Sequence, residues 1–177
     1  MSIRTSQPRR ISVLIVGFGQ MGHAMQALLG SRTHLSFWRV TPERQQPPPA
    51  VLEAVGQADC IVLCVPTMAI ATLLTELQAH LGKRTVVLSV AKGLDKAGRT
   101  AADILQVQFG IRSRWGVLGG PMIANELRAG RSGFAELGSR NAATQRLIDD
   151  LFRGTQLHLT SSSKPRAVSW CGVLKNV

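Results

Sequence analysis

Several residue types are scarce in this chain of 177 residues, and each scarcity narrows what the chain can do. It has no tyrosine and only 5% aromatic residues, so it lacks the stacking surface that binds single-stranded nucleic acid. Its three cysteines, at positions 60, 64 and 171, do not form a disulfide framework, and neither they nor the four histidines have metal-site spacing. We therefore expect reduced thiols in a cytoplasmic protein with no bound metal.

Long apolar runs and acidic residues are also scarce. No run approaches the roughly 18 apolar residues that a membrane helix needs, so no membrane span is expected. Ten acidic residues stand against 21 basic ones, which gives a net charge of +11. Such a balance favours anionic partners. Because the arginines are dispersed and aromatics are few, we expect phosphorylated small molecules and no nucleic acid, unless much of the charge is simply solvated surface.

The length bounds the domain organisation. A chain of 177 residues can form one domain with a substantial core, and it is too short for two full-sized ones. The polar and basic residues 1–10 predict a disordered tail. Residues 11–166 are expected to form the domain. The apolar segment 167–177, AVSWCGVLKNV, predicts the opening of a further helical domain, because it shows no signal for a helix end.

The most informative stretch is Ile11–Met25, ISVLIVGFGQMGHAM. Its apolar start predicts a buried strand over 11–16, and a helical pattern follows the glycines Gly17, Gly19 and Gly22. In a strand–turn–helix unit the first glycine allows a tight turn and the second lets a pyrophosphate approach the backbone. The third lets the helix pack closely on the strand. This pattern predicts a dinucleotide-binding loop at a helix N-terminus, with a plain turn as the alternative.

The residue that ends the second strand bears on which cofactor is bound. NAD-binding proteins carry an acidic residue about 20 positions past the glycines, where it accepts hydrogen bonds from the ribose hydroxyls. The expected strand at 35–40 has no acid at its tip and carries Arg39 there. Two interpretations stay open: Arg39 faces the 2′-phosphate of NADP, or it is only a surface residue.

Strands and helices alternate along the rest of the chain. Strand-like runs lie at 58–66, 85–90, 115–118, 131–137 and 157–159, and helical patterns lie at 51–55, 68–81, 99–108 and 142–152. Such alternation predicts an α/β fold with a doubly wound parallel sheet. Ligands of such sheets bind beyond the carboxyl ends of the strands. Pro66 and Lys92 follow two of these strands, and the turn Gly119-Gly120-Pro121 follows a third.

Four motifs occur in a characteristic order: GFGQMG at 17–22, ADCIVLCVP at 58–66, SVAKGL at 89–94 with GGPMIANEL at 119–127, and GVLKNV at 172–177. In this order and spacing the chain resembles the N-terminal half of NAD(P)-dependent glycerol-3-phosphate dehydrogenases, from about Ile11 to its last residue. The resemblance implies a Rossmann-type NAD(P)-binding domain and NADP or NAD as cofactor. It also implies interconversion of dihydroxyacetone phosphate and glycerol 3-phosphate by hydride transfer, which feeds glycerophospholipid synthesis.

The resemblance also implies roles for individual residues. The cofactor-binding set is Gly17, Gly19, Gln20, Met21, Gly22, Arg39, Pro66, Lys92 and Ala124. The substrate-binding set is Lys92, Gly120, Met122, Lys175 and Asn176, with Pro121 in the same turn. The expected catalytic residues are Lys175 and Lys92, and Lys175 is expected to exchange the proton at the substrate oxygen. Lys92 is expected to share its crevice, where a second ammonium and partial burial would lower the lysine pKa.

The sequence departs from the family's pattern in three places. Met122 stands where the family carries Ser, Thr or Asn, which removes a polar contact to substrate. The short segment QQPPPAVLEAVGQ, at 45–57, predicts that the family's third strand is missing or rudimentary. The family's helical substrate domain is expected beyond Val177, so we expect little turnover by residues 1–177 alone.

Alternative functions stay open beside this one. They are another reductase on the same fold, acting on ketopantoate or a 2-hydroxy acid, and a non-catalytic nucleotide-binding module. A homodimer through the C-terminal domain also stays open.

Overall fold

The computed structural model describes residues 9–41, 46–111 and 114–174. The strands are β1 Ser12–Val16, β2 His34–Trp38, β3 Cys60–Leu63, β4 Val86–Ser89, β5 Trp115–Gly119, β6 Gly133–Gly138 and β7 Leu157–Ser162. The helices are α1 Gln20–Leu29, α2 Pro49–Gln57, α3 Thr67–Leu77, α4 Ala101–Phe109, α5 Ala124–Arg128, α6 Ala142–Phe152 and α7 Pro165–Leu174, with a 3₁₀ turn at Gln78–His80. Most of the predicted tail, together with Lys175 and Asn176, lies outside the described residues.

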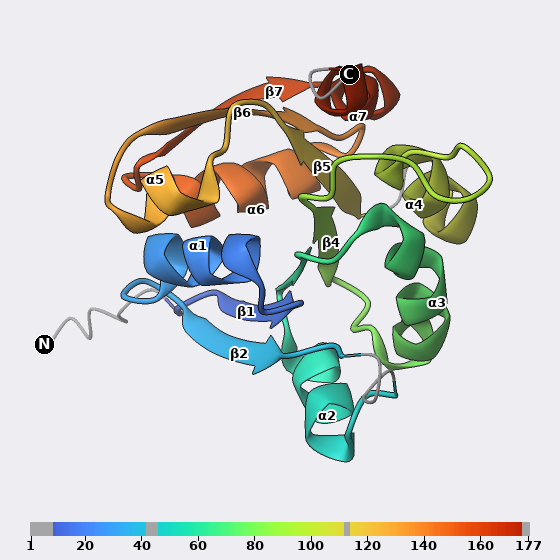
Figure 1. Cartoon of the computed structure of the whole chain (residues 1–177). Helices are drawn as coiled ribbons and strands as arrows, with labels where there is room; N and C mark the ends of the chain where they lie inside the picture. Colours follow the sequence, from blue (N-terminus) through green and yellow to red (C-terminus); the bar gives the residue numbers. More distant parts are fainter. Residues whose placement is uncertain (1–8, 42–45, 112–113, 175–177) are drawn as a thin grey trace, which may run out of the picture.

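One seven-stranded sheet organises the molecule, in the order β2-β1-β3-β4-β5-β6-β7 (Figure 1). The first five strands run parallel, as expected. β6 pairs antiparallel with β5, and β7 runs parallel to β6. The prediction of an α/β fold with a doubly wound parallel sheet is confirmed, with one exception that was not predicted: β6 runs antiparallel to β5. The connection from β5 to β6 contains only the five-residue helix α5, and a parallel crossover usually needs a longer helix to cross the sheet.

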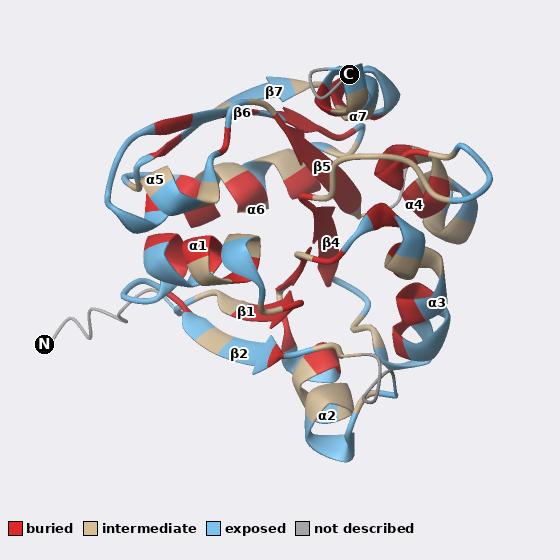
Figure 2. Ribbon diagram, viewed as in Figure 1, coloured by how far each residue is buried: buried red, intermediate tan, exposed pale blue. Residues whose placement is uncertain are grey.

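Helices cover both faces of the sheet, and each face has its own core. On one face, α1, α5 and α6 pack over residues such as Val13, Val62 and Leu137. On the other, α2, α3, α4 and α7 pack over residues such as Leu14, Leu63 and Val117. β3, β4 and β5 are buried along their whole length (Figure 2). Continuous apolar runs are what a sheet covered on both faces requires.

β2 forms one edge of the sheet, so no third strand flanks it within the described part of the chain. The described chain resumes at residue 46 and folds into α2, whose first residue is Pro49. Proline is tolerated there because the first helical residue has no acceptor for its amide. The expected loss of the third strand is confirmed for the residues that the structure describes.

α7 lies directly on β5 and β6 because two glycines leave it room. A Cβ on Gly119 would come within 2.8 Å of the Val168 carbonyl oxygen, and one on Gly138 within 2.6 Å of the Pro165 Cα. Val168 is buried in the same core as the sheet residues beneath it. The helix begins at Pro165, and the boundary predicted between 166 and 167 stays a prediction.

Candidate functional site

The carboxyl ends of four neighbouring strands bring together most of the residues that the sequence singled out. The glycine loop follows β1, Pro66 follows β3, Lys92 follows β4 and Gly120 follows β5. β1, β3, β4 and β5 are adjacent in the sheet and parallel, so these four loops share one edge (Figure 1). In open α/β sheets this edge is where ligands bind.

The glycine loop is built on two positions that admit no side chain. Gly17 has φ +92°, and a Cβ there would lie 2.5 Å from the Cys64 carbonyl oxygen at the end of β3. A Cβ on Gly22 would lie 2.3 Å from the Gly17 carbonyl oxygen. Gly22 therefore lets α1 pack against the turn itself, at the end of β1. The Gly17 amide donates to the Trp38 carbonyl, which ties the turn to β2.

Gly19 differs from its two neighbours because a Cβ there would meet nothing within 4 Å. It precedes α1 and provides no side-chain cap, and the first turn of α1 contains no acidic residue. The first amides of an α-helix have no partner within the helix, and the space beside Gly19 is open at the positive end of the helix dipole. Gln20 is exposed and Met21 is half-buried against the core. This geometry fits a phosphate of a dinucleotide.

Arg39 lies beside the glycine loop, as it must if it is to contact the 2′-phosphate of NADP. Its guanidinium carbon is 5.9 Å from the centroid of the Phe18 ring. Phe18 contacts Phe37 edge to face, with ring centroids 4.8 Å apart. Arg39 is exposed and makes no ion pair with any described acid. Its role at a 2′-phosphate stays a prediction.

Lys92 joins the loops that follow β4 and β5. Its Nζ donates to the Gly120 carbonyl oxygen at 3.1 Å. The Thr67 hydroxyl donates to the Gly93 carbonyl at 3.2 Å, so the first residue of α3 holds the same loop from the other side. Gly120 has φ +129°, and a Cβ there would lie 2.7 Å from the Phe134 carbonyl oxygen. The half-buried ammonium therefore has a fixed place at the sheet edge.

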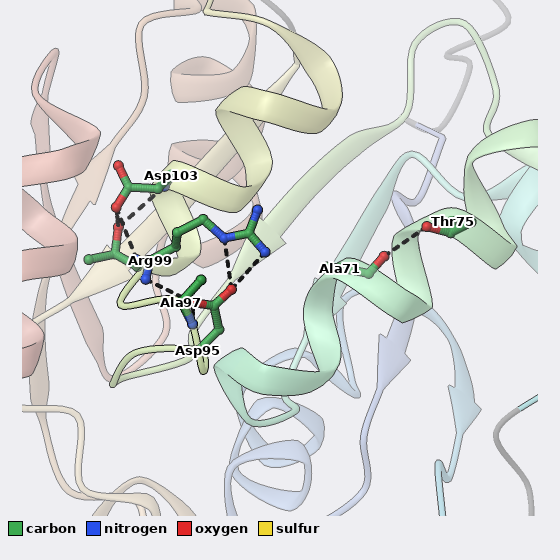
Figure 3. A network of polar contacts seen from close by, with 7 residues as sticks. Ala71, Thr75, Asp95, Ala97, Arg99 and Asp103 are labelled. Carbon is green, nitrogen blue, oxygen red and sulfur yellow. Dashed lines mark hydrogen bonds and ion pairs between the residues drawn. The ribbon is translucent and has the colours of Figure 1, made fainter.

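The loop after Lys92 is held by a polar network (Figure 3). One oxygen of Asp95 accepts from the Ala97 and Arg99 amides, at 2.9 and 2.8 Å, and the other accepts from the Arg99 side chain. These hydrogen bonds and the Arg99 charge hold the pKa of Asp95 below its usual value. The carboxylate therefore stays charged at neutral pH and fixes the turn that leads into α4.

Asp103 connects this network to α7. Its Oδ2 accepts from the amide and hydroxyl of Thr100, which forms a capping box at the start of α4. Its Oδ1 pairs with Arg166 of α7 at 2.6 Å. Partial burial raises the pKa of Asp103, but the Thr100 hydrogen bonds and the Arg166 charge outweigh it and lower that pKa. On α7, a Cβ on Gly172 would lie 3.7 Å from the Lys92 Cγ, so the helix passes beside Lys92.

The remaining predicted site residues differ in how accessible they are. Pro66 and Pro121 are exposed, and Ala124 is half-buried at the start of α5. Met122 is 3% exposed and packs in the core of the α1 face, so its side chain is not presented to a ligand in this structure. The predicted roles of Lys175 and Asn176 lie outside the described residues.

A hollow of roughly 440 Å³ opens next to Gly120, between α7 and the outer faces of β6 and β7. Its lining includes Phe134, Glu136, His158 and Cys171, and the described residues around it include no lysine or arginine. An anionic group would therefore find a positive partner at Lys92 and none among the described residues that line this hollow.

The cysteines lie apart from this chemistry. Cys60 is buried, and desolvation raises the pKa of the Cys64 thiol to about 12, which keeps it protonated. Within the described ranges, no group of three His, Cys, Asp or Glu side chains could hold a metal ion. None of the described helices is long and apolar enough to cross a membrane.

Two contacts near the site were not expected from the sequence. Arg128 of α5 donates to the Gln20 side chain, 108 positions away, and Arg166 pairs with Asp103 across 63 positions. The sequence contained one weak indication that Arg128 lies near the site: it follows the predicted cofactor-binding residue Ala124 by four positions, on the same face of a short helix.

Comparisons with known proteins identify the family of this chain. A family model described as "NAD-dependent glycerol-3-phosphate dehydrogenase N-terminus" matches residues 40–144. The cytoplasmic NAD⁺-dependent glycerol-3-phosphate dehydrogenase of Bos taurus is 30% identical over 132 residues, which are 73% of this chain and 37% of that protein. The NAD(P)⁺-dependent enzyme of Gloeobacter violaceus is 27% identical over 167 residues, 93% of this chain and 53% of its own length.

The fold has close counterparts among solved structures. The crystal structure of glycerol-3-phosphate dehydrogenase from Coxiella burnetii superposes with a TM-score of 0.79 at 18% identity, covering 93% of this chain and 57% of that one. At this identity the likeness concerns the fold. The chain spans about a third to just over half of the relatives that it matches. Because the family model matches more than half of the sequence, the chain belongs to the NAD-dependent glycerol-3-phosphate dehydrogenase family, in its N-terminal part.

Proposed function

We propose that this chain is the cofactor-binding part of an oxidoreductase that interconverts dihydroxyacetone phosphate and sn-glycerol 3-phosphate with NADH or NADPH. The observation that carries the proposal is the meeting of the glycine loop, Lys92 and Gly120 at one sheet edge. Family membership supports the same reaction class.

The residues around α1 suit a nicotinamide dinucleotide. The open space at Gly19 and the acid-free first turn of α1 would accept the pyrophosphate at the helix amides. Pro66, Lys92 and Ala124 are proposed to contact the rest of the cofactor; Pro66 and Lys92 follow β3 and β4, which end at the same sheet edge as β1. When bound, the reduced nicotinamide supplies the hydride, and the protein supplies position and charge.

Lys92 is the residue proposed to meet both ligands. Its ammonium is held at 3.1 Å from the Gly120 carbonyl oxygen, so it is oriented before a ligand arrives. A fixed positive charge there would attract a phosphorylated ketone and stabilise negative charge that develops on the ketone oxygen. Lys175 is proposed to donate the proton. It follows Gly172, which lies beside Lys92, by three positions.

The test is direct measurement of cofactor binding and turnover. We expect the 177-residue chain to bind NADH in calorimetry and to reduce dihydroxyacetone phosphate negligibly. A longer protein that includes a C-terminal helical domain is expected to be active. In that protein, Lys175→Ala should lower kcat much more than cofactor affinity, because catalysis is sensitive to the placement of such a group.

Several outcomes would overturn parts of the proposal. A wild-type chain that binds neither NADH nor NADPH would contradict the cofactor site. Turnover by the short chain at the rate of the longer protein would show that the substrate site lies wholly within these residues. Binding with no turnover by either protein would favour a non-catalytic nucleotide-binding module.

Three further parts of the proposal follow the family. The glycerol 3-phosphate formed would supply glycerophospholipid synthesis. The protein would work in the cytoplasm, as the names of the animal relatives state for those proteins. A longer protein would form a homodimer through its C-terminal domain, which sedimentation of that protein would test.

A further inference from the structure

A basic side chain that the family resemblance does not assign lies at the glycine loop. Arg128, the last residue of α5, donates from Nη1 to the Gln20 Oε1 at 3.1 Å. α5 packs along α1 on the same face of the sheet. The chain therefore brings a guanidinium from a distant segment to the first residue of the helix that follows the loop.

The direction of the Gln20 side chain decides where this guanidinium lies. Side chains of an α-helix lean toward its N-terminus. Gln20 is the first residue of α1, so its amide group leans toward the end of the helix that presents free backbone amides. A contact with that amide group brings Arg128 toward the same end.

The charges around Arg128 leave it available to an anion. Five other arginines pair with acids in the described part of the chain: Arg9, Arg99, Arg131, Arg153 and Arg166. Arg128 pairs with none of the described acids, and Glu126 on its own helix contacts Arg131 at 3.8 Å. Arg128 is exposed, and its neutral partner Gln20 is exposed as well. Replacing an amide oxygen by a phosphate oxygen would strengthen the hydrogen bond, because one partner would then be an anion.

We infer that Arg128 is a cofactor-binding residue that contacts the pyrophosphate of the dinucleotide at the N-terminus of α1. When the cofactor binds, the Arg128 guanidinium leaves the Gln20 Oε1 and donates to a phosphate oxygen. The backbone amides at the start of α1 donate to the same pyrophosphate. This inference rests on the proposed cofactor site. The two arginines then have different roles. Arg128 contacts the pyrophosphate that NADH and NADPH share, and Arg39 contacts the 2′-phosphate that only NADPH carries.

The test compares Arg128→Gln with wild type and with Arg131→Gln in the 177-residue chain. Arg131 is a matched control, because it is exposed, lies three residues away and already has a carboxylate partner. Calorimetric titrations use NADH, NADPH and ADP-ribose, which carries the pyrophosphate without the nicotinamide. Thermal unfolding of each variant checks that the fold is intact.

We expect Arg128→Gln to weaken all three ligands by about tenfold, the usual size of a lost charge-assisted contact. The ratio of NADPH to NADH affinity should stay unchanged, and Arg131→Gln should bind like wild type. Arg128→Lys should recover part of the loss, because a lysine keeps the charge without the planar fork.

Equal affinity of Arg128→Gln and wild type for ADP-ribose would overturn the inference and leave the proposed function standing. A loss confined to NADPH would also overturn it, because Arg128 would then contact the 2′-phosphate. If wild type binds none of the three ligands, the proposed cofactor site fails and Arg128 fails with it.

Discussion

Gly19 and Gly22 lie three residues apart, but the space around them differs. A side chain at Gly19 would extend into open space, whereas a Cβ on Gly22 would lie 2.3 Å from the Gly17 carbonyl oxygen. We therefore expect Gly19→Leu to fold normally and to lose NADH binding, because the new side chain would occupy the place of the pyrophosphate. Calorimetry together with thermal unfolding checks both parts. Unchanged NADH affinity in the folded variant would contradict the assignment of the loop.

Gly22→Ala provides the complementary change. Its methyl group would collide with backbone, so we expect a loss of roughly 1–3 kcal/mol in the free energy of unfolding, typical of overpacking. Urea unfolding followed by circular dichroism measures it. A Gly22→Ala variant as stable as wild type would show that the turn relaxes more easily than its packing indicates.

Arg39 is expected to determine the preference between the two cofactors. An arginine–phosphate contact contributes about 1.5–3 kcal/mol. Arg39→Ala should therefore weaken NADPH about tenfold or more and leave NADH unchanged. Titration of both cofactors checks this. Equal losses for both would instead assign Arg39 a packing role against the Phe18 ring.

At the scale of elements, α7 is held by its packing on β5 and β6 and also by the ion pair between Arg166 and Asp103. The pair of Arg166 with Asp103 is partly exposed, so its removal should cost less than about 1 kcal/mol. We expect Arg166→Gln to lower the melting temperature by at most about 4 °C. Amide exchange should quicken in α7 but not in α4, because the Thr100 capping box remains.

Arg153→Gln is the matched control for this change. Arg153 directly follows α6 and pairs with Asp150 inside that helix, so this ion pair does not reach α7. It should leave exchange in α7 unaltered. Faster exchange throughout the sheet of Arg166→Gln would mean that the ion pair supports the whole fold rather than α7.

Asp103 makes the same junction sensitive to acid. Its pKa is lower in the folded chain than in the unfolded chain, so its stabilising contribution is present above about pH 4 and is lost as the pH falls through the folded value. We expect the acid-induced fall in stability below about pH 4 to be shallower in Asp103→Asn. Urea midpoints measured between pH 3 and pH 7 check the slope.

Most elements could be predicted because their apolar periodicity is strong. The helix over Ala142–Phe152 was predicted at its observed bounds, and the buried strands differ from their predicted spans only at the ends. The direction of β6 could not be read in this way. Its pattern of alternating burial is the same for either orientation, and only the short α5 connection decides between them.

At the scale of the whole molecule, the positions of candidate residues were predictable where they follow strand ends and were not where they depend on contacts between distant segments. Pro66, Lys92 and Gly120 were identified because parallel strands end at a common edge. Arg128 was missed because it reaches Gln20 only through the packing of α5 on α1. The burial of Met122 was missed because an apolar residue in a ligand-binding turn can face either the core or the ligand.

The antiparallel direction of β6 has a consequence for how the sheet unfolds. β5 and β6 pair antiparallel, whereas β6 and β7 run parallel, share six residue pairs and are connected by α6. The sheet therefore has a seam, which α7 and the Ser139 hydrogen bond to the Trp115 carbonyl bridge. We expect β6, α6 and β7 to unfold as one cooperative unit before the parallel strands. Native-state hydrogen exchange in mild denaturant would then show two classes of amides, one on each side of this seam. A ligand that holds α7 against Lys92 would stabilise the junction, so that both classes exchange at the same rate.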